Sequence, residues 1–138
     1  VLRLMRQKQV DVNVFHCNAA LGATGAKGQW RLALETLMQD LRELRLEPDT
    51  VSYNAAIHSC GKGGRWAVAL ELLQRMDSAR LRPNTITLGA SINACGSCSH
   101  WELGVSLLRK MPEMHMMPHT TSYNSAITAC GEGSEWQL

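Results

Sequence analysis

The feature that most constrains this chain is a set of residue ladders that share one period. Tryptophan, a Cys-Gly pair and proline each recur about every 35 residues along the 138-residue sequence. Ladders with a common period indicate one supersecondary unit copied in tandem, and such units stack into a solenoid instead of a globule. A solenoid presents a row of equivalent surfaces, which suits it to contact an extended ligand one step per unit. The ladders comprise Trp30, Trp66, Trp101 and Trp136, then Cys60, Cys95 and Cys130, then Pro48, Pro83 and Pro118.

Each unit has the pattern of two helices joined by a glycine turn. In the second unit, Asp49 or Thr50 is suited to cap a first helix over residues 52–60, and the glycines that follow can end it. A second helix is predicted from near Trp66 to about Ala79, because its apolar residues keep helical spacing. We therefore predict an all-α fold, an α-solenoid of tandem helix-turn-helix repeats wound into a right-handed superhelix.

The period also divides the chain into repeats. The first complete repeat has one residue more than the others between Trp30 and Pro48, which we expect to lengthen its second helix. The chain is expected to begin and stop within a repeat, like a part of a longer array. The predicted divisions are 1–13 as the end of a preceding repeat, 14–49, 50–84 and 85–119 as repeats, and 120–138 as a partial fourth repeat.

Composition narrows the class of protein only in part. Hydrophobic residues make up 45% of the chain and charged residues 19%, which argues against disorder. The formal charge of +2 neither supports nor excludes a nucleic-acid partner. We expect no membrane span, because no run of 18 apolar residues occurs. Equivalent cysteines of stacked helices should lie roughly 10 Å apart, too far for disulfides, so we expect reduced thiols in an intracellular or organellar setting.

The two helices of a unit differ in polarity. First helices are almost uncharged, whereas second helices carry residues such as Glu71 and Arg75. Second helices are therefore expected to form the outer, convex layer, which could contact protein partners, and first helices should face a groove. The tryptophans are expected to pack between helices instead of forming a stacking platform for RNA bases. We assign Met38, Met76 and Met111 to one position of the second helix, as gap-filling core.

Residues that could support catalysis or metal binding do not assemble into a recognisable motif. Cys95 and Cys98 have the C-x-x-C spacing of a redox pair or half a zinc site. A zinc site needs four converging ligands, so we expect no metal. The histidines lack a carboxylate or serine partner at a repeated position, so no catalytic triad or acid–base pair can be built. We expect no cofactor and no enzyme, and any catalytic domain would lie outside these residues.

The order of residues within a unit resembles the pentatricopeptide repeat, in its P-type, 35-residue form. A Tyr-Asn pair opens a short apolar helix, and Cys-Gly-Lys-Gly-Gly-Arg, Ala-Leu-Glu-Leu-Leu-x-x-Met and Leu-x-Pro-Asn follow. Residues 50–84 match throughout, and the resemblance covers nearly the whole chain. The tetratricopeptide repeat has a 34-residue period and a different layout of tryptophan, glycine, tyrosine and alanine.

The resemblance implies selective binding of single-stranded RNA, with one base read per repeat. In the family, the fifth residue of the first helix and the last residue of the unit form the reading pair. On this chain the pairs become Asn18 with Asp49, Asn54 with Asn84, and Gly89 with His119, while Asn124 opens a fourth pair. The residues implied to sandwich bases are Phe15, Val51, Ile86 and Thr121, and Lys62 is the implied phosphate contact.

The residue types at these positions indicate pyrimidines. Asparagine carries a donor and an acceptor, and an added Asp supplies an acceptor for uracil N3–H, whereas an added Asn supplies a donor for cytosine N3. With RNA running 5′ to 3′ along the array, the resemblance implies U, then C with some U, then any base, then a pyrimidine. Gly89 has no side chain, so the third repeat is expected to space instead of read. Cations are few, so binding should be weak and only modestly dependent on salt. The positions matching Lys62 hold Ala26, Ser97 and Glu132.

The functional hypothesis from the sequence is therefore an RNA-binding module of an organellar factor for RNA processing, stability or translation. Location in a mitochondrion or chloroplast follows from the resemblance only. The alternative is a protein–protein interaction scaffold of the tetratricopeptide type, with a peptide in the same groove. Asparagine at a fixed position of the first helices favours bases over peptides.

Overall fold

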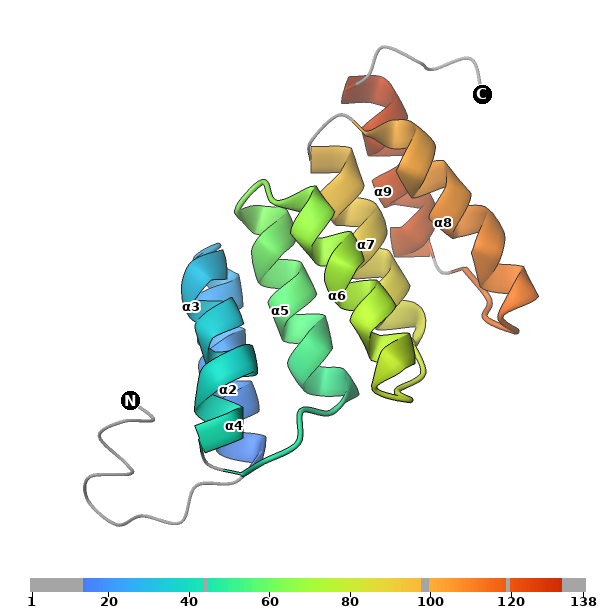
Figure 1. Cartoon of the computed structure of the whole chain (residues 1–138). Coiled ribbons are helices and arrows are strands. Elements are labelled where there is room, and N and C mark those ends of the chain that lie inside the picture. Colours follow the sequence, from blue (N-terminus) through green and yellow to red (C-terminus); the bar gives the residue numbers. More distant parts are fainter. Residues whose placement is uncertain (1–13, 44, 98–99, 119, 133–138) are drawn as a thin grey trace.

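The computed structural model describes residues 14–43, 45–97, 100–118 and 120–132, and it confirms the predicted all-α solenoid (Figure 1). Within these ranges the chain folds into helices and turns, with no strand. The first helices of the repeats are α2 (Val14–Ala26), α5 (Thr50–Lys62), α7 (Thr85–Ser97) and α9 (Thr120–Glu132). The second helices are α3 (Trp30–Glu35) with the π-helical segment η1 (Thr36–Asp40) and α4 (Leu41–Glu43), then α6 (Trp66–Ser78) and α8 (Trp101–Glu113).

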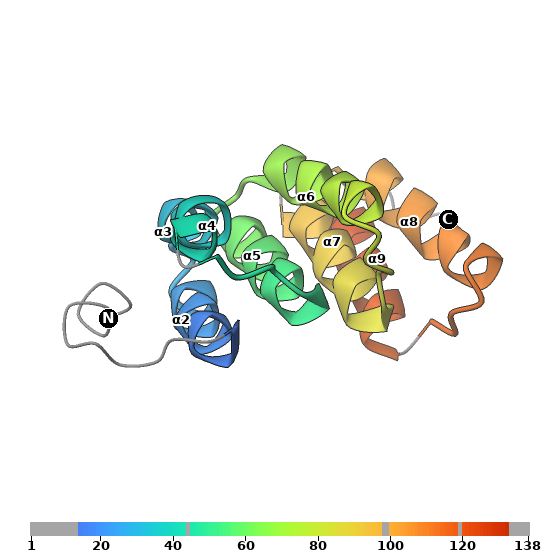
Figure 2. The same ribbon diagram turned by 60° about the horizontal axis from the view of Figure 1, so that its bottom comes forward.

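The helices form two layers. Figure 2 shows α2, α5, α7 and α9 side by side in one layer, which we call the first-helix layer, and α3–α4, α6 and α8 in the other. Consecutive first helices contact one another, and each second helix also packs on the first helix of the next repeat. Every repeat therefore buries its apolar face partly against its neighbour, as solenoid units must. None of the described helices is long and apolar enough to cross a bilayer.

Local sequence signals set where the helices begin and end. Asp49 caps α5, since its side chain accepts a hydrogen bond from the Ser52 backbone N–H at 2.9 Å. After α5, Gly64 takes the left-handed conformation with φ of 71°, and the Arg65 N–H donates to the Cys60 carbonyl at 2.8 Å. This six-to-one bond satisfies a terminal carbonyl of the helix. A similar turn ends α6, where Arg80 has φ of 59°.

The core lies between the two layers and is built from residues that recur with the repeat. Ala33, Ala69 and Gly104 are buried at one position of successive second helices, where small residues allow a close helix crossing. Cys60 and Cys95 of the cysteine ladder are fully buried thiols on the first helices, and Cys17, at a different position of the first repeat, is fully buried on α2. Burial raises the pKa of the Cys60 thiol to about 11, because the apolar core disfavours a thiolate.

Trp30, Trp66 and Trp101 are half-buried, and the first two contact the repeat that follows. The Arg65 guanidinium lies over the Trp30 ring at 4.7 Å from its centroid, and the Trp66 ring lies 4.0 Å from the His100 ring. Arg65 and His100 each immediately precede the next tryptophan of the ladder. Trp30 also packs against the core cluster of its own and the following repeat. The rings therefore contribute to the repeat interfaces. Trp136 lies outside the described residues.

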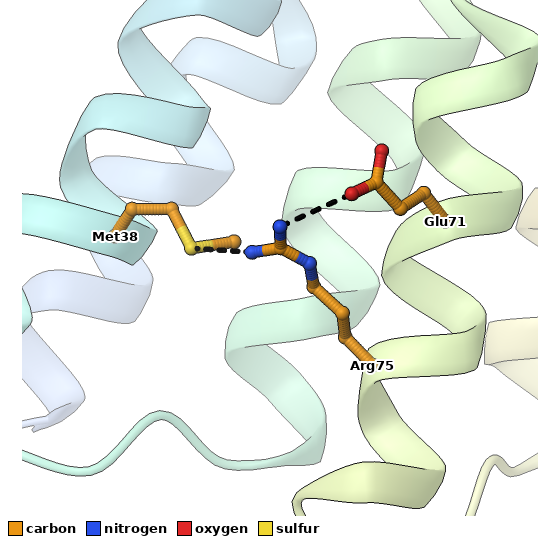
Figure 3. Close-up of polar contacts among 3 residues, drawn as sticks. All are labelled: Met38, Glu71 and Arg75. Carbon is orange, nitrogen blue, oxygen red and sulfur yellow. Dashed lines mark hydrogen bonds and ion pairs between the residues drawn. The ribbon is translucent and has the colours of Figure 1, made fainter.

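The extra residue of the first repeat is accommodated by a π-helical turn, and this corrects the assignment of Met38. The backbone hydrogen bonds of η1 span five residues instead of four, which takes up one extra residue, so the buried positions shift by one after it. Leu41, not Met38, is the buried counterpart of Met76. Figure 3 shows Met38 beside the neighbouring helix α6, where its sulfur accepts a hydrogen bond from Arg75 Nη1 at 3.2 Å while Arg75 Nη2 donates to Glu71 at 3.1 Å.

Candidate nucleic-acid interface

The structure brings Asn18 and Asp49 together at the junction of the first and second repeats. Asn18 Nδ2 on α2 donates to Asp49 Oδ1 at 3.1 Å, across 31 residues of sequence. The Ser52 hydroxyl on α5 donates to Asn18 Oδ1 at 2.6 Å and also lies 2.9 Å from Asp49 Oδ1. A hydroxyl has one proton, so its shorter contact with Asn18 fixes the orientation of that amide.

Asp49 is held as a carboxylate by this network. Burial on its own would raise the pKa of Asp49. The hydrogen bonds from the Ser52 backbone N–H and the Asn18 amide, together with the nearby dipole of the Ser52 hydroxyl, outweigh that cost and hold the pKa of Asp49 below its ordinary value. The side chain therefore presents an ionised acceptor at neutral pH.

The next junction repeats this arrangement with different residue types. Asn54 Nδ2 on α5 donates to Asn84 Oδ1 at 3.3 Å, and the Thr87 hydroxyl on α7 donates to Asn54 Oδ1. Asn84 caps α7, because its Oδ1 accepts from the Thr87 backbone N–H at 3.0 Å. The backbone N–H of Asn84 in turn donates to the Thr87 hydroxyl at 3.0 Å, so the cap is reciprocal.

The two junctions use the same atom of the capping residue and differ in the other one. In both Asp49 and Asn84, Oδ1 accepts two hydrogen bonds. One comes from a backbone N–H at the start of the helix, and the other comes from the asparagine amide of the preceding repeat. The second terminal atom is an acceptor, Oδ2, in Asp49 and a donor, Nδ2, in Asn84. Both capping residues are exposed. The two junctions therefore have the same hydrogen-bond network around Oδ1, and they differ in the second terminal atom, which is an acceptor at one junction and a donor at the other.

The third junction is built differently. Gly89 on α7 occupies the position of Asn18 and Asn54, and it supplies no amide. The hydroxyl of Ser122, which corresponds to Ser52 and Thr87, is buried and has no hydrogen-bond partner within the part of the chain that the structure describes. His119 lies outside the described residues.

The remaining predicted contacts lie on the same layer. Val51 and Ile86 are 58% and 68% exposed, which is unusual for residues of this size and leaves their side chains able to pack on a planar ligand. Lys62 is exposed at the end of α5, beside the turn at Gly28 of the preceding repeat. Asn124 is exposed on α9. The side chains of Phe15 and Thr121 lie outside the described ones.

His58 adds a further group to this layer. It is exposed on α5, one helical turn before Lys62. Burial of part of the ring and the charge of Lys62 both lower the pKa of His58, so the imidazole is neutral at neutral pH. Lys62 therefore supplies the positive charge at this end of α5.

Sequence reasoning missed the bridging hydroxyls Ser52 and Thr87. Each lies three residues after a capping Asp or Asn, which is the spacing of a reciprocal cap. The pairs Asp49-x-x-Ser52 and Asn84-x-x-Thr87 were therefore visible as local signals. Their contact with an asparagine more than 30 residues earlier depends on how repeats stack, which spacing along one helix does not give.

The structure holds no group of three or more metal-ligating side chains within its described ranges. Cys95 is buried on α7, whereas Cys98, the other cysteine of the C-x-x-C motif, lies outside those ranges.

Three family models match the sequence. The model of the PPR repeat family matches residues 48–97, that of the pentatricopeptide repeat domain matches residues 1–63, and a further PPR repeat model matches residues 91–116. No curated protein matches the chain significantly.

Solved structures with the same arrangement of helices share little sequence identity with this chain. The pentatricopeptide repeat protein PPR10 in complex with an 18-nt psaJ RNA element is 17% identical, with a TM-score of 0.85 over 97% of this chain. A further structure of the pentatricopeptide repeat protein PPR10 from maize gives a TM-score of 0.78 over 95% of this chain, also at 17% identity. The chain spans about a fifth of that protein, 20% and 19% in the two structures. The PPR domain of Arabidopsis thaliana protein-only RNase P 1 in complex with tRNA is 10% identical, with a TM-score of 0.77 over 96% of this chain and 69% of that one.

Proposed function

Because this chain belongs to the pentatricopeptide repeat family, we propose that its first-helix layer binds single-stranded RNA and reads one base at each repeat junction. Two fold relatives were solved with RNA, one with an 18-nt RNA element and one with tRNA. The layer is almost free of charged side chains, so recognition would depend on hydrogen bonds and stacking more than on charge.

The observation that carries this proposal is the pair of equivalent networks at Asn18–Asp49 and Asn54–Asn84. Each network holds an asparagine amide and a capping side chain in a fixed orientation through Oδ1. Prealigned polar groups of this kind bind a base edge with little loss of conformational freedom. A structural role in capping alone would need no asparagine amide from the preceding repeat.

The free terminal atom of each capping residue would then select the base. Asp49 Oδ2 would accept from N3–H of uracil, and Asn84 Nδ2 would donate to N3 of cytosine. Exposed Val51 and Ile86 would pack on the faces of neighbouring bases. The proposed order is U at the first junction and C, with some U, at the second, on RNA that runs 5′ to 3′ in the direction of the chain.

The proposed cellular role rests on family membership. Proteins of this family are typically organellar, so we place the proposed RNA target in a mitochondrion or chloroplast, in RNA processing, stability or translation. Microscopy of the parent protein carrying a fluorescent tag tests the location, and a diffuse cytoplasmic signal would contradict it.

Reciprocal alanine variants test the RNA reading. Selection from randomised single-stranded RNA should enrich adjacent U and C for the unchanged protein. Asn18→Ala should erase selectivity for U and leave that for C, and Asn54→Ala should do the reverse, so each variant is the control for the other. The discrimination lost should be about 1–3 kcal/mol per base, the usual worth of hydrogen bonds to an otherwise unpaired buried group. Enrichment of purines at both positions, or of no RNA at all, would contradict the proposal and favour a peptide-binding scaffold.

A further inference from the structure

A groove lies in the layer of second helices, away from the proposed RNA face. It runs between α6 and α8, which both pack on α7 (Figure 1), and it has a volume of about 310 Å³. Leu103 on α8 and Met114 just after it are 37% and 41% exposed, so the groove presents apolar surface to solvent. The leucines that line it come from all three helices and are Leu70, Leu73, Leu88, Leu103 and Leu107.

Opposite charges stand on the two walls of this groove. Asp77 of α6 lines one wall and Lys110 of α8 lines the other. Both side chains are exposed, and neither forms an ion pair with another residue in the ranges that the structure describes. Asp77 repels a phosphate backbone, so the groove does not suit a nucleic acid. Charges of opposite sign beside an apolar surface instead suit a ligand that carries the complementary pair.

The corresponding place between the first and second repeats is filled from within the chain. There Met38 of η1 is half-buried against the core, and its sulfur contacts Arg75, which also pairs with Glu71 (Figure 3). One repeat later, Lys110 stands for Arg75 and Ser106 stands for Glu71. Helix α6 has no π-helical insertion to bring a side chain like Met38 across. The groove between α6 and α8 therefore lacks both the apolar side chain and the carboxylate that complete its neighbour.

We propose that the groove between α6 and α8 binds an amphipathic helix of a protein partner. The helix lies along the groove and inserts large apolar side chains, such as Leu or Met, at positions i and i+4. A carboxylate on one flank of its apolar stripe meets Lys110, and a basic side chain on the other flank meets Asp77. Charges on the two flanks of a helix set which way it lies, so the groove accepts the partner in one direction. The partner therefore supplies from outside what Met38 and Glu71 supply at the neighbouring place.

Selection from a displayed peptide library tests this inference. The library consists of alanine-rich helical peptides of about 16 residues, a length at which such helices form, with the residues of one face and its two flanks randomised. Selection on the 138-residue chain should enrich Leu or Met at i and i+4, an acidic residue on one flank and a basic residue on the other. A selection that enriches no sequence, or enriches peptides without an apolar stripe, would overturn the proposal.

Reversing one charge on α8 shows where the enriched peptides bind. Lys110→Glu should weaken their binding about 3- to 10-fold, and selection repeated on this variant should change the preferred residue on that flank from acidic to basic. Arg109→Glu is the matched control, because it makes the same change at the next residue, which is exposed and does not line the groove. Equal effects of the two reversals would overturn the proposal.

Replacing an apolar residue of the groove tests the leucine-lined part. Leu103→Arg should weaken the peptides by roughly 10-fold or more, since a central apolar contact carries much of the binding energy. Leu103 is partly exposed, so the variant should keep its helical circular dichroism. Peptide binding that survives this substitution would overturn the proposal. Self-association of the chain that Leu103→Arg abolishes, with no peptide enriched, would assign the groove to a second copy and would also overturn it.

Discussion

At the scale of residues, the candidate interface depends on side chains that serve the fold and the ligand with different atoms. Asp49 Oδ1 caps α5 and holds Asn18, and Oδ2 is the atom that we propose contacts a base. The same division holds for Asn84. Because helix capping already fixes these side chains, their orientation is set before any base arrives.

The lowered pKa of Asp49 leads to a prediction about acid. A carboxyl whose pKa is lower in the folded than in the unfolded state stabilises the fold above its ordinary pKa, and this contribution is lost as the pH falls through the folded value. We therefore expect the melting temperature of the protein to fall as the pH drops below about 4. The melting temperature of the Asp49→Asn variant should fall less over that range, because an amide can still cap the helix and does not titrate. Parallel melting curves followed by circular dichroism at several pH values measure this, and identical acid responses of the two proteins would contradict it.

The reading pairs were predictable from the sequence as positions, but their geometry was not. The repeat period made Asn18 equivalent to Asn54 and Asp49 equivalent to Asn84, and the resemblance to the family implied that they form pairs. Which atom of each side chain caps the helix, and that a hydroxyl joins the pair, depend on contacts between repeats. His119 lies outside the described residues, so its pairing with Gly89 remains a prediction.

At the scale of elements, the turn between α5 and α6 is shaped by contacts with the preceding repeat. Gly63 has an ordinary φ of −82°, so its backbone would accept another residue. A Cβ atom there would overlap the Trp30 ring, which packs on this turn from the preceding repeat. Trp30 therefore requires a glycine at position 63 by close packing and not by backbone conformation.

A pair of glycine substitutions tests this interpretation. Gly63→Ala should lower the free energy of unfolding by about 1–3 kcal/mol, the usual cost of overpacking. The matched control is Gly22→Ala on α2, where an added Cβ meets nothing within 4 Å. That change should raise the free energy of unfolding by about 0.5–1 kcal/mol, because alanine favours a helix over glycine. Urea denaturation measures both, and a neutral or stabilising effect of Gly63→Ala would show that Trp30 does not fix the turn.

The boundaries of the helices followed closely from sequence signals, except at the single-residue insertion. Trp66 starts the second helix where predicted, and the end at Ser78 is one residue from the prediction. The period of the sequence showed an extra residue after Trp30 but not where the helix would absorb it. A π-helical turn at 36–40 takes it up because this keeps both Ala33 and Leu41 buried. The position of the π-helical turn therefore depends on how the residues before and after it pack, and the repeat period does not contain this information.

At the scale of the whole molecule, the array combines a core of two apolar clusters with a first-helix layer of low charge. The net charge of +2 on 138 residues gives no strong field to attract RNA. Lys62 is the cation predicted to meet a phosphate, and it stands at one end of the first-helix layer. Affinity should therefore come mainly from base contacts, with a small electrostatic part.

The salt dependence of binding tests this balance. The slope of log K against log salt should be no steeper than about −2, since each phosphate contact with a single strand contributes about −0.7. Lys62→Ala should make the slope less steep by about 0.7 and weaken binding of all sequences alike. Lys110→Ala serves as the control, because this exposed lysine lies on α8 in the other layer. Two results would contradict the proposed placement of the RNA on the first-helix layer. One is an equal slope for the unchanged protein and the Lys62 variant, and the other is a change of slope with Lys110→Ala as large as that with Lys62→Ala.

The central claim is that one terminal atom of the capping residue selects the base, and Asp49→Asn tests it most directly. This near-isosteric change makes the first junction carry the same pair as the second, Asn with Asn, while Oδ1 can still cap α5. The decisive measurement is the ratio of dissociation constants for two RNAs that carry U or C at the first junction and are otherwise identical. The unchanged protein should prefer U, and the variant should prefer C, with a combined shift of roughly 10-fold or more, equivalent to about 1.4 kcal/mol. An unchanged preference for U in a variant that still binds RNA would contradict the claim.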